Sequence, residues 1–337
     1  MRHDAPSIRW YRVTLDRHVS KSLHQRSDWR AALQMSGHLV LIGLLGTLAW
    51  RVRDAPLLLV PVLFLYGTCY AFILNATHEL SHRSVFRTPV LNEFFLRLLC
   101  FFGWRSHVMF WTSHAEHHKH TLHQPDDLEV VLPVKLTLSR FLTEAFVDVR
   151  GFFHTLRRTV ALSLGKVDGA WEEYLQGRMK FDRKRSLIRW ARLLLIGHVT
   201  LVAVSFYLGL WMVPVLTTFG IFYGQWLRFL CNHTQHAGLT DQVPDFRLCT
   251  RTVLLNPLVR FLYWHMNYHI EHHMYPAVPC YNLGRLHAAI RAELPECPLG
   301  LVAAWRQIIA TVRRQKRDPH YHFVPVLPAP PPVLLEH

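Results

Sequence analysis

Two long stretches without charge dominate the first quarter of the chain. Residues 31–50 and residues 56–77 contain no Asp, Glu, Lys or Arg, and most of their positions are apolar. A helix of about 20 apolar residues spans the roughly 30 Å of hydrocarbon in a bilayer. Each stretch therefore predicts a transmembrane helix. Because only five residues separate the two stretches, we expect an antiparallel hairpin.

A third charge-free stretch, residues 193–227, is too long for a single crossing. Gly209 and Pro214 interrupt it, and both residue types disfavour a continuous helix. The stretch therefore predicts a second hairpin, with spans over about 193–210 and 212–231. The expected fold class is an all-α integral membrane protein with four transmembrane helices in two hairpins.

The regions outside the spans define the domain organisation. Residues 1–30 form a basic N-terminal segment, residues 31–322 a single membrane domain, and residues 323–337 a Pro-rich tail that we expect to be disordered. Two further apolar stretches, residues 90–104 and 252–264, contain charged positions. Such stretches are typical of amphipathic helices at the membrane interface rather than of spans.

The charge distribution predicts the orientation of the chain in the membrane. The chain has 38 Lys and Arg against 23 Asp and Glu, a formal net charge of +15, and seven of the basic residues precede the first span. The turn at residues 209–214 has none. The positive-inside rule then places both termini and the long middle segment on the cytoplasmic side, at the inner or plasma membrane if the protein is bacterial. The spread of basic residues along membrane-flanking segments favours contact with anionic lipid, and we expect no nucleic-acid partner.

Histidine is unusually abundant, with 24 residues, and its spacing is regular. Residues 78–82 form a His-x-x-x-His motif, and residues 114–118 and 269–273 each form His-x-x-His-His. We call these the three histidine boxes. Positions i, i+3 and i+4 share one face of a helix, so each box directs its imidazoles at one point.

The predicted spans place the three boxes on one side of the membrane. An even number of crossings separates the first box from the last, so all three lie in a cytoplasmic helical cap and can converge. Neutral imidazole suits iron, copper and zinc, but eight or more imidazoles exceed what one ion accepts. We therefore expect two metal ions. A structural zinc site favours cysteine, which is absent from the boxes, and this favours iron.

The polar residues next to the boxes are candidates for supporting roles. Glu79, Glu116 and Glu271 lie one residue off the ligand face of their boxes. We expect them to orient ring nitrogens of the ligands. His233 and His265 are expected beside the site or along a substrate channel rather than on the metal, and Asn267 is expected beside the site as a further supporting residue.

The boxes, their order and their place between two helical hairpins resemble the membrane fatty acid desaturase-like superfamily, the non-haem di-iron desaturases and hydroxylases. The resemblance covers about residues 31–286. Residues 267–276, NYHIEHHMYP, are similar to the third box of the family, including Asn267 before it and Pro276 after it. Residues 232–236 match an Asn-x-x-x-His element that supplies one more ligand and a water-linked asparagine, here Asn232. The iron ligands that the resemblance implies are His78, His82, His114, His117, His118, His236, His269, His272 and His273.

The resemblance implies an O2-dependent oxidoreductase that acts on an unactivated aliphatic C–H bond, with desaturation of a fatty acyl chain or other lipid as the favoured reaction. Residues 78–83 and 232–239 are similar to alkane hydroxylase-type members, whereas the second box is not. Hydroxylation or oxidative demethylation of a lipid, an alkane-like or a small-molecule substrate therefore stays open.

The two electrons for such a reaction must come from another protein. The sequence has no flavin fingerprint, no cytochrome-like extension and no cysteine set for an iron–sulfur cluster. We expect a ferredoxin or rubredoxin with its reductase, and a basic protein surface suits an acidic carrier.

Two other functions fit parts of the pattern. Residues 78–82 also match the His-Glu-x-x-His motif of zinc metalloproteases, in which Glu79 would be the general base. That function leaves the other two boxes without a role. A metal carrier without catalysis is disfavoured because no charged path runs through the predicted spans.

Overall fold

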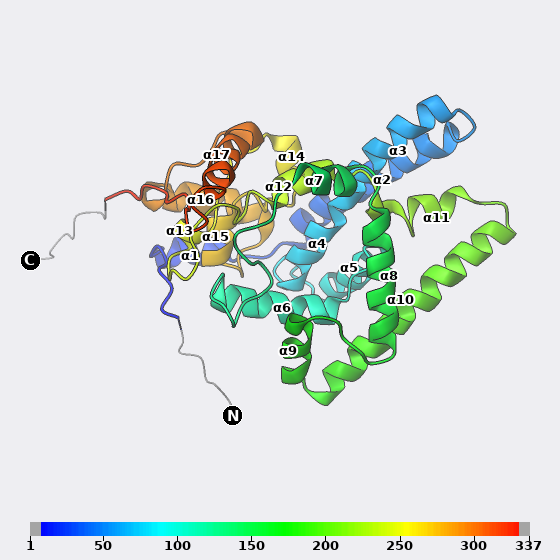
Figure 1. Ribbon diagram of the computed structural model, residues 1–337, viewed down its shortest axis with the longest axis horizontal. Coiled ribbons are helices and arrows are strands. Elements are labelled where there is room, and N and C mark those ends of the chain that lie inside the picture. The colour runs from blue at the N-terminus through cyan, green and yellow to red at the C-terminus, as the bar shows by residue number, and fades with distance from the viewer. Residues whose placement is uncertain (1–7, 330–337) are drawn as a thin grey trace, which may run out of the picture.

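The computed structural model describes residues 8–329, and every regular element within them is a helix (Figure 1). Extended segments in this part of the chain meet only at isolated β-bridges. The expectation of an all-α fold is therefore confirmed. The ends of the predicted basic segment and tail, residues 1–7 and 330–337, lie outside the described residues.

Two apolar helices near the N-terminus pack along each other. α2 (Asp28–Arg51) begins after Ser27, whose hydroxyl accepts a hydrogen bond from the first turn of the helix. α3 (Pro56–Ala71) begins with a proline, which suits the first turn because it has no amide hydrogen to satisfy. α3 continues through Phe72 into α4 (Ile73–Ser81). Figure 1 shows α2 and α3 projecting together from the rest of the molecule.

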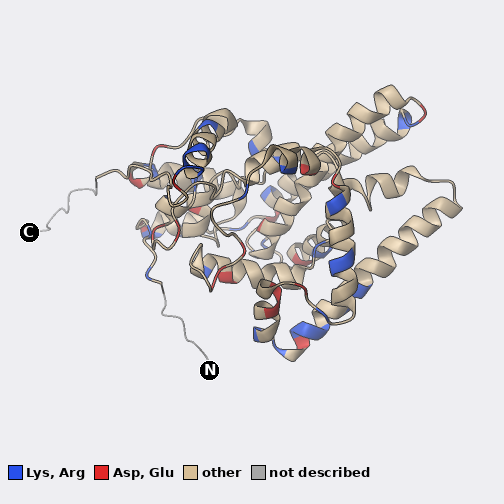
Figure 2. Ribbon diagram, in the orientation of Figure 1, with Lys and Arg blue, Asp and Glu red and all other residues tan. Residues whose placement is uncertain are grey.

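A third long helix, α10 (Phe181–Tyr207), has a charged end and an apolar end. Figure 2 shows that its charged residues gather at one end, and residues 193–207 contain none. Apolar side chains such as Leu44 on α2, Val60 on α3 and Ile196 on α10 are exposed, at 64%, 67% and 67% of their surface. By length and composition, the helices over residues 28–51, 56–81 and 181–207 can cross a membrane.

The predicted fourth span, over residues 212–231, is wrong as a continuous helix. The structure has three short helices there, α11 (Met212–Leu216), η1 (Gly220–Phe222) and α12 (Trp226–Asn232). Among the described residues, three helices rather than four have the length and apolar composition of a span.

A close backbone approach explains the break. Gly224 has a φ of +69°, and a Cβ atom there would lie 2.7 Å from the Thr68 amide nitrogen and 2.8 Å from the Gly67 carbonyl carbon. Glycine is the residue that tolerates both the left-handed conformation and the contact. The chain therefore passes close against α3 at Gly224, and α12 begins two residues later.

The remaining helices are shorter and form the body of the molecule (Figure 1). Helices occur at both predicted interfacial stretches, as α5 and α14. The full set is α1 (Arg17–Leu23), α5 (Pro89–Phe102), α6 (His107–His120), α7 (Leu138–Ala145), α8 (Val149–Ser163), α9 (Ala170–Arg178), α13 (Phe246–Cys249), α14 (Pro257–Leu262), α15 (His269–Met274), η2 (Cys280–Asn282), α16 (Leu283–Ile290), η3 (Arg291–Glu293) and α17 (Gly300–Gln315).

A buried polar link ties the first two long helices to the C-terminal third of the chain. The Trp264 indole donates a hydrogen bond of 3.0 Å to Nδ1 of His38 on α2. Nε2 of His38 then donates to the Cys69 carbonyl of α3 at 2.9 Å. Because both ring nitrogens have partners, His38 acts as an interhelical connector.

The packing of α3 gives a first prediction. A Cβ atom at Gly67 would lie 2.5 Å from the Tyr223 carbonyl oxygen, so Gly67→Ala must push the backbone apart. We expect a loss of about 1–3 kcal/mol of stability, the usual cost of overpacking, measured as a lower Tm in detergent. Gly43→Ala on α2 is the control, because no atom lies within 4 Å of its Cβ position. Equal Tm values for the two variants would contradict the proposed close contact.

Candidate metal centre

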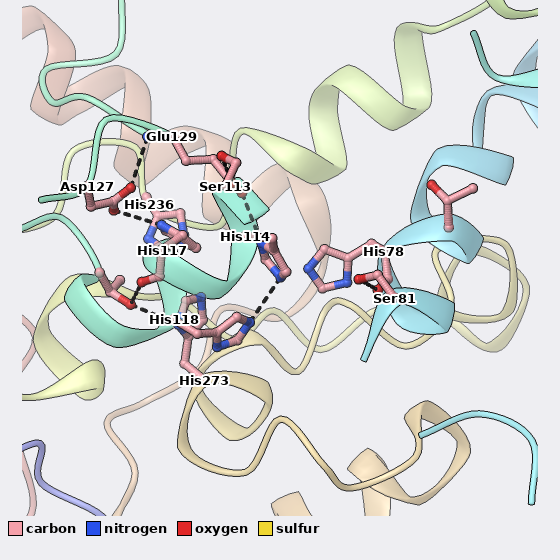
Figure 3. A network of polar contacts seen from close by, with 12 residues as sticks. His78, Ser81, Ser113, His114, His117, His118, Asp127, Glu129, His236 and His273 are labelled. Atoms are coloured by element: carbon pink, nitrogen blue, oxygen red, sulfur yellow. Dashed lines mark hydrogen bonds and ion pairs between the residues drawn. The ribbon is translucent and has the colours of Figure 1, made fainter. Parts of the chain in front are cut away.

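Three separate helices bring the histidine boxes together. His78 lies on α4 and His82 directly follows it, the second box lies on α6, and the third lies on α15. α6 begins at Ser106, whose hydroxyl accepts a hydrogen bond from the Met109 amide at 3.2 Å, and α6 packs against α4. His236 joins the boxes from the turn after α12. Figure 3 shows imidazoles from these elements facing one another.

Five of the imidazoles form one group, which we call the five-histidine group. One nitrogen of each ring can be chosen so that all five lie within 4.8 Å of one another. The Nε2 atoms of His114 and His118 are 3.0 Å apart. All three boxes contribute to the group, whose members are His78, His82, His114, His118 and His272.

The other four imidazoles form a second cluster, the four-histidine group. His117, His236 and His273 offer nitrogens that lie within 4.8 Å of one another. Nε2 of His269 is 3.1 Å from Nε2 of His236 and 3.1 Å from Nε2 of His273. The two groups adjoin, since the ring centroids of His118 and His273 are 4.5 Å apart. The structure thus brings together all nine histidines that the sequence singles out.

The nitrogen spacing fits two metal ions. A metal–imidazole bond of about 2.1 Å places two ligand nitrogens about 3.0 Å apart when the bonds meet at a right angle, and the Nε2 pairs of both groups have this spacing. In the five-histidine group, Nε2 of His82 and Nε2 of His272 are buried without a hydrogen-bond partner. A buried nitrogen without a partner is costly in a metal-free protein and is accounted for by a metal bond.

Burial keeps most of these rings neutral, the form in which imidazole binds metals. It lowers the pKa of His82 to about 3 and, with a smaller effect of neighbouring His117, lowers the pKa of His236 to about 3. Burial also depresses the pKa values of further members far below the usual range, namely His114, His118, His269, His272 and His273.

Glu79 connects two of the boxes. Its Oε1 accepts a hydrogen bond from Nδ1 of His78 at 3.0 Å and lies 3.6 Å from Nδ1 of His272. The side chain is 1% exposed. A carboxylate in this position orients the His78 ring, so that its opposite nitrogen is available to the five-histidine group, whereas Nδ1 of His272 has no hydrogen-bond partner.

The histidines open onto a cavity of about 610 Å3, which we call the central cavity. Its wall combines metal-facing residues with apolar side chains from the long helices and their neighbours. Asn232 lines it close to the four-histidine group, and its Oδ1 accepts a hydrogen bond from Nδ2 of Asn75 at 3.2 Å. The volume is that of a typical small-molecule site. The apolar part of the wall includes Leu74, Trp104, Phe110, Leu194, Ile221 and Phe222.

Comparison with known proteins gives the family of the chain. The model of the fatty acid desaturase family matches residues 55–305, which include all nine histidines. The chain belongs to the fatty acid desaturase family. It is also similar to a sphingolipid delta(4)-desaturase of Komagataella phaffii, with 25% identity over 287 residues that cover 82% of this chain and 73% of that protein. The resemblance inferred from the boxes is confirmed, and this desaturase-family chain is a membrane-bound oxidoreductase of the lipid-desaturase type.

Two acidic residues that the sequence analysis missed support the second box. Oδ2 of Asp127 accepts a hydrogen bond from Nδ1 of His117 at 2.8 Å, and Oε1 of Glu129 accepts one from Nδ1 of His114 at 2.9 Å (Figure 3). Asp127 is fully buried. Burial alone would lower the pKa of His117, but the Asp127 carboxylate outweighs it and raises that pKa. The signal in the sequence is the acidic run at residues 126–129, shortly after the box.

Two of the predicted supporting glutamates lie elsewhere. Glu116 pairs with Lys119 at 2.8 Å on the outer side of α6. Glu271 accepts a hydrogen bond from Thr252 at 2.5 Å and pairs with His287. In the described part of the chain neither carboxylate forms a hydrogen bond or an ion pair with one of the nine histidines, whereas Glu79, which also adjoins a box histidine, does.

The other predicted neighbours of the boxes have structural contacts. Nδ1 of His233 donates to the Phe229 carbonyl at 2.8 Å. Nδ2 of Asn267 donates to the Val253 carbonyl at 2.9 Å. His265 lies within the turn that follows α14, with a left-handed φ of +58°, and its amide donates to the Arg260 carbonyl at 3.0 Å. None of the three belongs to either histidine group.

The contact between Asp127 and His117 gives a second prediction. In the unmodified chain the Asp127 carboxylate orients His117 and makes its ring more basic. Asp127→Asn removes this charge, so we expect metal to bind the four-histidine group about 10-fold to 100-fold more weakly. The measurement is metal content per chain after dialysis against a graded series of chelator concentrations. Asp126→Asn is the control, because that neighbouring carboxylate contacts the Tyr174 hydroxyl instead. Equal metal retention in the two variants would argue against a supporting role for Asp127.

Proposed function

We propose that this desaturase-family chain is a di-iron, O2-dependent lipid desaturase. The observation that carries the proposal is the division of nine histidines into two adjoining groups, each with the nitrogen spacing of a metal site. The five-histidine group would hold one iron and the four-histidine group the other. Asn232 would hold a water near the second ion, because its side chain lines the central cavity together with His236 and His269.

Iron is the metal that suits both the donors and the family. The donor set is neutral nitrogen without thiolate, which iron accepts, and the family reaction is an oxidation. When bound, the two irons would activate dioxygen for the removal of hydrogen from an unactivated C–H bond.

The residues of the chain hold this chemistry in place. Glu79, Asp127 and Glu129 accept the Nδ1 protons of their histidines, which fixes the tautomer and leaves the Nε2 lone pairs free for metal. The apolar wall of the central cavity binds hydrocarbon and excludes water from the reacting carbon. Its shape determines which hydrogens lie within reach, and therefore whether two hydrogens are removed or an oxygen is added.

A lipid is the substrate class that we propose, because the similar protein from Komagataella phaffii is a sphingolipid desaturase and the cavity wall includes side chains of the long apolar helices. Hydroxylation is the second candidate, since residues 232–239 are similar to hydroxylase-type members. A zinc protease is disfavoured, because Glu79, its general base, is engaged by His78.

We also propose that the histidine groups lie on the cytoplasmic side and that an external carrier of the ferredoxin or rubredoxin type, with its reductase, supplies two electrons. The basic segment before α2 supports the orientation by the positive-inside rule.

Product analysis tests the proposed reaction. The iron-loaded chain is reconstituted with a ferredoxin or rubredoxin and its reductase, and lipid products are analysed by mass spectrometry. We expect about two irons per chain and a product lighter by two hydrogens. A product heavier by one oxygen would replace desaturation by hydroxylation. One zinc per chain and peptide cleavage would instead support the protease.

Substitution of one proposed metal ligand tests whether the histidine groups bind metal, provided that the substitution leaves the fold unchanged. His272→Ala removes one of five nitrogens from a buried group, so we expect iron content to fall toward one per chain, with loss of activity and retained helicity by circular dichroism. His265→Ala, outside both groups, should keep both irons. Full iron content in His272→Ala would contradict the assignment of ligands.

A further inference from the structure

The central cavity contains arginines without acidic partners. Three acidic residues line it, but each is already engaged: Asp148 accepts from the Gly151 amide at 2.8 Å, Glu129 from His114, and Glu172 pairs with Arg158. Arg105 and Arg228 line the same cavity, and neither forms an ion pair in the described part of the chain.

Arg105 is held by neutral groups close to the five-histidine group. Its Nη1 donates to the Leu74 carbonyl and to the Thr77 hydroxyl, both at 3.0 Å. Its guanidinium lies 4.3 Å above the ring of Phe110. These contacts fix the orientation of the guanidinium, and Glu129 attracts its charge through space without forming an ion pair with it.

Arg228 has fewer hydrogen-bond partners than Arg105. Its Nη1 donates to Oε1 of Gln225 at 3.1 Å, and its Nε is buried without a hydrogen-bond partner. The acidic residue nearest along the neighbouring helix α7 is Glu144, which is engaged by Arg140 at 2.6 Å. A buried guanidinium nitrogen that lacks a hydrogen-bond acceptor is unfavourable unless a ligand supplies one.

Both arginines lie within reach of the metal-facing residues. Arg228 precedes Asn232 by four residues on α12, so one helical turn of about 5.4 Å separates them on the same face. Arg105 binds Thr77, the residue directly before His78. Both arginines are therefore tied to segments that carry residues of the cavity wall beside the histidine groups.

We propose that Arg105 and Arg228 bind an oxyanion, a carboxylate or a phosphate, that the substrate carries within a few bonds of the carbon that is oxidised. This rests on the proposed function in assigning the anion to the substrate. The planar guanidinium matches both oxyanions with paired hydrogen bonds. The apolar remainder of the substrate would lie along Leu74 and Leu194, which belong to helices long enough to cross a membrane. Alkanes and neutral lipids without such a group would leave both charges unpaired.

Binding of matched probes tests the proposal without iron, oxygen or an electron donor. The full chain in a neutral detergent is titrated with octanoate, octyl phosphate and 1-octanol, which share one alkyl chain, and Tm is followed by tryptophan fluorescence. We expect octanoate or octyl phosphate to raise Tm with concentration and 1-octanol to leave it unchanged, because ligands that bind the folded state stabilise it.

Variants then assign the effect to the arginine. Arg228→Gln should weaken the apparent Kd of the anionic probe about 10-fold to 100-fold, as expected for loss of a charge-assisted hydrogen bond. Arg150→Gln on α8, an exposed arginine outside the cavity lining, is the control and should keep the wild-type Kd. Arg228→Lys keeps the charge and should retain most of the stabilisation by octyl phosphate. If Arg228→Gln does not fold, the comparison of octanoate with 1-octanol in the unmodified chain still tests whether the cavity prefers an anionic group.

Three outcomes would overturn the proposal. Equal stabilisation by 1-octanol would show that the alkyl chain alone is recognised. Equal stabilisation by inorganic phosphate would indicate a free-anion site unrelated to the substrate. An unchanged Kd in folded Arg228→Gln would remove the arginine from the site. Oxidation of neutral lipid without anion-selective binding would reject this subsite and leave the proposed function in place. Anion-selective binding by a chain that oxidises no lipid would reject the proposed function and leave the subsite in place.

Discussion

The confinement of nine imidazoles to one buried region is the constraint on which the rest of the structure depends. Two protonated rings at these spacings would repel strongly in a poorly solvated interior, so most of the rings must stay neutral, and a ring needs an acceptor at Nδ1 to be fixed in orientation. Glu79, Asp127 and Glu129 meet this need for three rings, and the Cys249 carbonyl accepts from Nδ1 of His236 at 2.9 Å. The lone pairs that remain point inward, and on our proposal they bind iron.

The break in the chain after α11 serves the same arrangement. The expected helix over residues 212–231 is interrupted after Leu216 and again around Gly224, whose backbone lies close against α3, and α12 begins two residues later. α12 presents Arg228 and Asn232 to the central cavity, and the turn after it presents His236. The break thus precedes the helix that brings Arg228 and Asn232 to the cavity wall and leads to His236.

The central cavity combines two environments that an amphiphile requires. Side chains of the long helices make one part apolar, and two arginines without acidic partners make another part cationic. On our proposals, hydrocarbon binding alone would not determine which carbon of the substrate's alkyl chain lies next to the irons. An oxyanion bound by the arginines would fix the position of the carbon that is oxidised. Positioning of this kind is the main contribution of a protein to a reaction whose bond-breaking step belongs to its cofactor.

The sequence alone determined the features that depend on local periodicity. Charge-free runs predicted the long helices, and the i, i+3, i+4 spacing predicted which histidines share a face, because both follow from the fixed geometry of a helix. Tertiary structure decided which residues from distant parts of the chain contact the histidine boxes. Asp127 and Glu129 reach the second box by a loop whose path cannot be read from periodicity, Glu116 pairs with Lys119 although it adjoins a box histidine, and the expected fourth span consists of short helices. These outcomes depend on which distant segments meet, and the free energy of that packing belongs to the whole fold and not to any short stretch of the chain.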